Sequence, residues 1–180
     1  MDHFRRQFLG RRIHPAVVLG IARKYRIPEL IEQAVRVLAR PGLPLSSWST
    51  DPKIICHTTV IEVGTIGRLK EKILLARFAL CAIPPVTHNP ACRDGQRARC
   101  SSSWKEFWMV NVVPFLTSVG GEEDMSAWAI RTDCVAAARV HSMTETCMQW
   151  AINEAVAHPG WGAEYKMIDG AIEALMVSGH

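Results

Sequence analysis

Side chains that can do chemistry are concentrated in one segment, CAIPPVTHNPACRDGQRARC, which runs from Cys81 to Cys100. It contains Cys81, His88, Cys92 and Cys100, separated in turn by six, three and seven residues. Thiolate and imidazole are preferred ligands of structural zinc, and four of them close a tetrahedral site. A bound ion would also order an irregular, proline-containing segment, because the free energy of metal binding becomes free energy of folding. One interpretation is therefore a zinc site made of these four residues.

The sequence leaves two other interpretations of the same residues open. Their spacing lacks the paired C-x2-C knuckles that are typical of zinc sites. In a secreted protein Cys92 and Cys100 could form a disulfide. Alternatively Cys81 ends the preceding helix as a small buried hydrophobe, and the loop thiols are inert. The remaining cysteines lie within predicted helices, where packing into the core is the expectation: Cys56, Cys134 and Cys147.

Motifs of the common enzyme classes are absent from the sequence. It contains no G-x-S-x-G, no P-loop, no G-x-G-x-x-G and no H-E-x-x-H. Cys56 is followed directly by His57. Neighbours on a helix point about 100° apart, so these two do not make a nucleophile–base pair with each other. We therefore expect a non-catalytic protein, with a small zinc-dependent regulator or enzyme built on the Cys/His loop as the alternative.

Two amphipathic helices are predicted near the start of the chain, over residues 15–25 and 28–40. Pro15 and Pro28 each suit a first helical position, and Pro41-Gly42 ends the second helix. Apolar residues recur at helical spacing in both segments. A tight turn between two such helices makes an αα-hairpin, which must bury its apolar side against further helices.

The hairpin carries a set of core-type positions: Pro15, Ala22, Arg23, Lys24, Tyr25, Ile27, Leu30, Ala34 and Leu38. A later run extends from Gly64 through Arg77 into the cysteine-bearing loop and ends at Trp104. With these features the first two thirds of the chain resemble the helical region that follows the BTB domain in BTB/POZ-domain proteins of mushroom-forming (basidiomycete) fungi. Only the residues before Pro15 precede the hairpin, so we expect the BTB domain itself to be missing. The resemblance implies a protein-interaction or scaffold module.

The rest of the chain predicts more helix. Apolar periodicity indicates helices over residues 52–63, 65–80, 125–140, 143–157 and 162–176, and a further helix begins at Ser102 or Ser103, with Pro114 kinking or ending it. Together these elements predict an all-α fold of about seven or eight helices packed as consecutive αα-hairpins. We expect a single domain over residues 1–180, with an irregular Cys/His loop at 81–103.

Composition and charge narrow the class of protein. Hydrophobic residues make up 48% of the 180, which disfavours disorder, and no apolar run is long enough to cross a bilayer. The N-terminal stretch lacks the apolar core of a secretory signal, so we expect an intracellular protein, cytoplasmic or nuclear. Basic residues dominate the first 100 positions but are scattered, so nucleic acid is not an expected partner. The expected partner is another protein or a second copy of the chain, with Phe4, Phe8 and Leu9 lining the contact.

Overall fold

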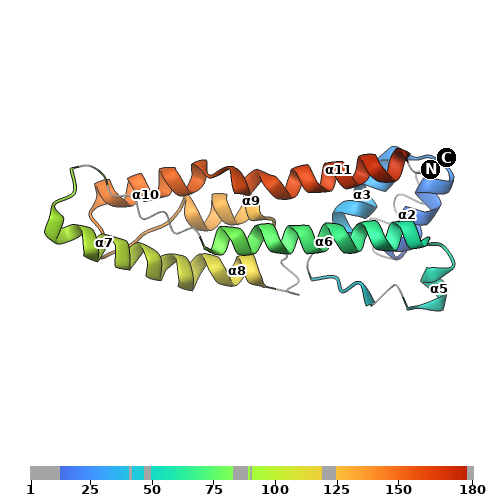
Figure 1. Ribbon diagram of the computed structural model, residues 1–180, viewed down its shortest axis with the longest axis horizontal. Helices are drawn as coiled ribbons and strands as arrows, with labels where there is room; N and C mark the ends of the chain where they lie inside the picture. The colour runs from blue at the N-terminus through green and yellow to red at the C-terminus, as the bar shows by residue number, and fades with distance from the viewer. Residues whose placement is uncertain are drawn as a thin grey trace. The chain divides into compact units, whose positions relative to one another are not determined.

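The computed structural model describes residues 13–40, 42–46, 50–82, 89, 91–118 and 125–177 (Figure 1). Every regular element within these residues is helical, which confirms the predicted all-α class. The chain divides into two compact units: unit 1 is Met1–Ile73 with Tyr165–His180, and unit 2 is Leu74–Glu164. The single domain expected over residues 1–180 stays a prediction. Phe4, Phe8 and Leu9 lie outside the described residues.

Unit 1 begins with the predicted pair of helices, α2 (Pro15–Lys24) and α3 (Pro28–Leu38), which contact each other. His14 caps α2, because its Nδ1 atom accepts the backbone N–H of Ala16 at 3.2 Å. The turn between the helices uses a left-handed backbone at Arg26, with φ of 53°. Both helix starts therefore fall at the prolines from which the sequence predicted them.

The next helix differs from its prediction. Helix α5 (Pro52–Ile55) is only one turn long, and α6 (Val60–Cys81) starts well before Gly64, which it includes. The prediction of helices over 52–63 and 65–80 was therefore wrong at their shared boundary. The reason is a capping box at Thr59 and Glu62. The Thr59 hydroxyl accepts the N–H of Glu62 at 3.3 Å, and the Glu62 carboxylate accepts the N–H of Thr59.

The interior of unit 1 is aliphatic, with an ion pair at its edge. Its buried residues are alanine, valine, leucine and isoleucine from α2, α3, α5, α6 and α11 (Ala163–Val177). Arg23 contacts the buried carboxylate of Glu62 at 2.9 Å and donates through Nε to the carbonyl of Leu175 at 3.2 Å. Gly20 lies against the backbone of His57, where no side chain would fit. The core of unit 1 is therefore held together by contacts among its own residues.

Unit 2 contains α7 (Asp94–Phe107), a π-helical stretch over Trp108–Val112 and α8 (Val113–Thr117). Helix α7 begins at Asp94, so the irregular loop predicted to extend to residue 103 ends ten residues earlier. Asp94 lies in the first turn, where the helix dipole favours an acid. Pro114 lacks an N–H and its ring excludes the normal bond to the preceding turn, which accounts for the wider π turn before it.

The second half of unit 2 contains α9 (Ala127–Ile130), a π-helical stretch over Arg131–Val135 and α10 (Glu145–Ala157), followed by a 3-10 turn at Pro159–Gly162. The helix predicted over 125–140 therefore ends early. Its last turn closes with the wide bond from the Ala136 N–H to the Arg131 carbonyl, at 2.9 Å. The predicted helices over 143–157 and 162–176 are confirmed to within two residues at each end.

The main interior of unit 2, its aromatic core, contains three buried tryptophans among aliphatic residues. Trp108 packs between Trp104 and Trp161, with ring centroids 6.1 Å from each. The Trp161 indole N–H donates to the carbonyl of Ala155 at 2.6 Å. Cys81, at the end of α6, is half-buried against this core. A second and much smaller buried cluster of unit 2 lies elsewhere, and it contains only cysteines.

Candidate metal centre

The small cluster consists of Cys92, Cys100 and Cys147. All three are buried, with 8%, 2% and 2% of their surfaces exposed. Their sulfur atoms all lie within 4.8 Å of one another. Sulfurs at this spacing can share one metal ion, because a zinc–sulfur bond is about 2.3 Å long. Three buried cysteines this close together could therefore hold a metal ion.

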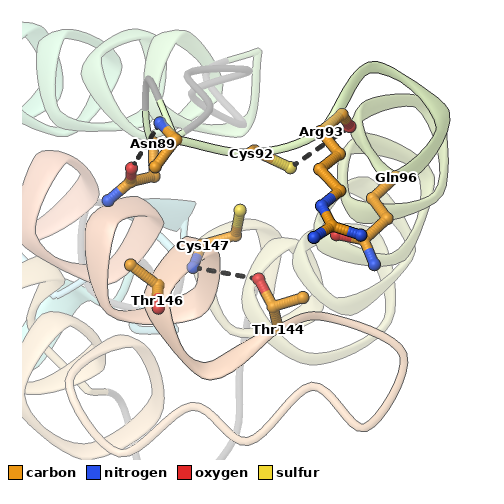
Figure 2. A pocket seen from close by; sticks show the side chains of 8 residues that line it. Asn89, Cys92, Arg93, Gln96, Thr144, Thr146 and Cys147 are labelled. Carbon is orange, nitrogen blue, oxygen red and sulfur yellow. Dashed lines mark hydrogen bonds between the residues drawn. The ribbon is translucent and has the colours of Figure 1, made fainter.

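Two helix starts position the three sulfurs. Cys92 lies two residues before α7, in a turn closed by its own N–H, which donates to the Asn89 carbonyl at 2.8 Å. Cys100 follows within α7. Cys147 is the third residue of α10, whose N-cap Thr144 accepts the Cys147 N–H at 3.4 Å (Figure 2). Helices α7 and α10 contact each other, so one local packing event assembles the cluster.

Hydrogen bonds among the three cysteines shift the pKa values of Cys92 and Cys147 in opposite directions. The pKa of Cys92 is raised to about 11, first by its hydrogen bond to Cys147 and then by burial. Burial by itself would raise the pKa of Cys147, but hydrogen bonds from Thr144, Cys92, Cys100 and the backbone of Asn89 lower it below its ordinary value. Cys147 also lies at the positive end of α10. These hydrogen bonds favour the thiolate form of Cys147 over its thiol.

A pocket of about 190 Å³ opens beside the sulfurs. Figure 2 shows Cys147 pointing from α10 toward the segment that carries Cys92, with Thr144 on one side and Asn89 on the other. The pocket is lined by Asn89, Ala91, Cys92, Arg93, Gln96, Thr144, Thr146 and Cys147. Cys100 is not among these residues. Two of the three cysteines thus line the pocket.

The four residues that the sequence suggested as ligands do not all lie at the cysteine cluster. Cys92 and Cys100 come together, as free thiols. Cys81 packs against the aromatic core instead, where burial raises the pKa of its thiol. His88 lies outside the described residues. The third sulfur belongs to Cys147, which the sequence analysis assigned to the core of a helix.

A local signal for Cys147 exists in the sequence. The segment Thr144-Glu145-Thr146-Cys147 places a capping residue three positions before the cysteine, which predicts a thiol at a helix start. Its distance from Cys100 along the chain hides the pairing, because only the packing of α10 on α7 brings them together. Spacing arguments within one segment could not have found it.

Comparison of the chain with protein-family models, with curated proteins and with solved structures finds no match. A search of the described helices for a stretch long and apolar enough to span a membrane finds none.

Proposed function

We propose that this chain is a non-catalytic protein-interaction or scaffold module whose unit 2 is held together by a zinc ion bound to Cys92, Cys100 and Cys147. The observation that carries the metal part is the convergence of three buried sulfurs within 4.8 Å. Soft thiolate ligands favour zinc among the common divalent ions. The scaffold part rests on the resemblance to the helical region of fungal BTB proteins.

The surroundings of the cluster favour a metal over simple packing. The apolar residue that packs against the three cysteines is Met143, itself half-buried. Three cysteines and one methionine bury little hydrocarbon, and each buried methylene contributes only about 0.8 kcal/mol. A bound ion would join α7 to α10 far more firmly, because metal affinity adds directly to the stability of the folded state.

A closed structural zinc site needs a fourth ligand. We propose His88 for this position, as the sequence analysis did. His88 directly precedes Asn89, whose backbone hydrogen-bonds the sulfur of Cys147. Together the four residues would make a Cys3His site, a common type of structural zinc site.

The test is the metal content of the full chain, purified without chelator from cells supplied with zinc. We expect about one zinc per chain, as in closed structural sites. Cys147→Ser should lose the zinc, because a serine hydroxyl does not replace a thiolate ligand. His88→Ala should bind more weakly but still bind, since three thiolates remain.

Two matched variants make the result specific. Cys134→Ser changes a half-buried cysteine of the same unit and should keep its zinc. Cys81→Ser should also keep it, because Cys81 packs against the aromatic core. Absence of stoichiometric zinc from the unaltered chain, or its loss from Cys81→Ser with retention in Cys147→Ser, would contradict the proposal.

A further inference from the structure

The three cysteines of the cluster differ in their position relative to the pocket. Cys92 and Cys147 line it, and Cys100 does not. The pocket walls include the polar side chains of Asn89, Arg93, Gln96 and the two threonines at the start of α10. A small polar oxidant such as a peroxide can therefore reach two sulfurs that lie within 4.8 Å of each other.

To form a disulfide, the sulfurs of Cys92 and Cys147 must approach from within 4.8 Å to bonding distance. A disulfide needs about 2.05 Å between sulfurs. Cys92 lies in a turn before α7, and rotation about its Cα–Cβ bond changes the position of its sulfur without moving a helix. Cys100 is fixed within the second turn of α7. The pair Cys92–Cys147 combines access to the pocket with one partner on a turn.

We propose that the cluster is an oxidation-gated metal site, in which a peroxide joins Cys92 to Cys147 and the bound ion is released. This inference rests on the proposed zinc site. The disulfide consumes two of the four proposed ligands, and Cys100 and His88 are too few to close a tetrahedral site around the ion. A dithiol reductant would restore both ligands and hence metal binding.

The chemistry balances with peroxide as the oxidant. One pocket-facing thiolate attacks a peroxide oxygen; the O–O bond breaks, and the departing hydroxide takes a proton to become water. The resulting sulfenic acid is attacked by the second sulfur, a sulfur–sulfur bond forms, and its hydroxyl leaves as a second water. The two cysteines lose two electrons in total, and the peroxide gains them.

The experiment treats the full chain, reduced and loaded with zinc, with hydrogen peroxide. Zinc release is followed with a chromogenic chelator, and the crosslink is mapped by mass spectrometry of proteolytic peptides. We expect one zinc released for each disulfide formed, a peptide pair linking Cys92 to Cys147, and recovery of zinc binding after a dithiol is added. Cys134→Ser should behave like the unaltered chain, and Cys100→Ser should still form the crosslink.

The outcomes separate this inference from the proposed function. A reduced chain that binds no zinc overturns the proposed function, and the crosslink is still read independently by mass. A chain that binds zinc but forms no Cys92–Cys147 crosslink, or links Cys92 to Cys100 instead, overturns the assignment of Cys92 and Cys147 as the oxidised pair. The proposed zinc site would stand. A crosslinked chain that keeps its zinc overturns the gating.

Discussion

The two units stabilise their interiors in different ways. Unit 1 packs aliphatic side chains from several helices into one core and places the Arg23–Glu62 ion pair at its edge. Unit 2 divides its buried residues between an aromatic core and a separate group of three cysteines. The aromatic core has its own charged contact, the bidentate pair of Arg77 with Glu164. Among the described residues, the charged contact at the cysteine cluster is a single hydrogen bond, from Arg97 Nε to the carbonyl of Cys92 at 3.1 Å.

The difference shows where a ligand would matter. Unit 1 gains its stability from burial, from the capping box at the start of α6 and from the ion pair. At the cysteine cluster of unit 2 the buried groups are polarisable sulfurs that can bind metal, and their hydrocarbon content is small. We therefore expect metal to leave the stability of unit 1 unchanged. The stability of the first turns of α7 and α10 should depend on it.

The largest expected effect is the loss of local stability in unit 2 when the metal is removed. With free zinc at 1,000 times its dissociation constant, binding stabilises the folded state by about 4 kcal/mol. Amide hydrogen exchange in the first turns of α7 and α10 should therefore accelerate about a thousandfold on addition of chelator. Exchange in α3 of unit 1 should stay unchanged, and an equal acceleration there would abolish the distinction between the units.

The next effect concerns the ion pair of unit 1. Arg23→Met leaves the carboxylate of Glu62, only 2% exposed, without its charged partner. The loss of one partner of a buried pair costs about 3 kcal/mol. Urea unfolding followed by circular dichroism, with zinc present, measures it. The control is Arg36→Met, which removes an exposed pair with Asp169 and should change stability by less than about 1 kcal/mol.

A smaller effect is expected at Gly20. An added methyl group there would overlap the carbonyl oxygen of His57, so α2 and the segment after α5 must separate. Gly20→Ala should lower the free energy of unfolding by about 2 kcal/mol, as overpacking does. Gly170→Ala in α11 meets no atom within 4 Å and should instead stabilise unit 1 by about 0.5–1 kcal/mol. Equal effects of the two changes in thermal unfolding would refute the close approach.

Local signals predicted much of the fold. Pro15 and Pro28 marked helix starts, and the all-α class followed from apolar periodicity. The misplaced boundary at Gly64 came from overlooking Thr59 and Glu62, whose reciprocal bonds outweigh a glycine inside a helix. The helix that begins at Ala127 ends early through a π turn. The spacing of apolar residues does not distinguish such a turn from α-helix. Division into two units depends on long-range packing, which no local pattern carries.

The candidate site was predicted only in part, because long-range packing also decides which cysteines meet. Cys92 and Cys100 lie in one segment, so their spacing could be weighed directly. Cys147 enters only because α10 packs on α7, a contact between distant parts of the chain. Cys81 was included because it lies near the others in sequence, although α6 directs it into the aromatic core.

X-ray absorption at the zinc edge of the reduced, zinc-loaded chain tests the central claim most directly, because it counts the atoms bound to the ion. The account predicts three sulfurs at about 2.3 Å and one nitrogen or oxygen at about 2.0–2.1 Å. A shell of nitrogen and oxygen alone would show that the ion binds elsewhere. Four sulfurs would also contradict the account, since a fourth cysteine would then have to join Cys92, Cys100 and Cys147.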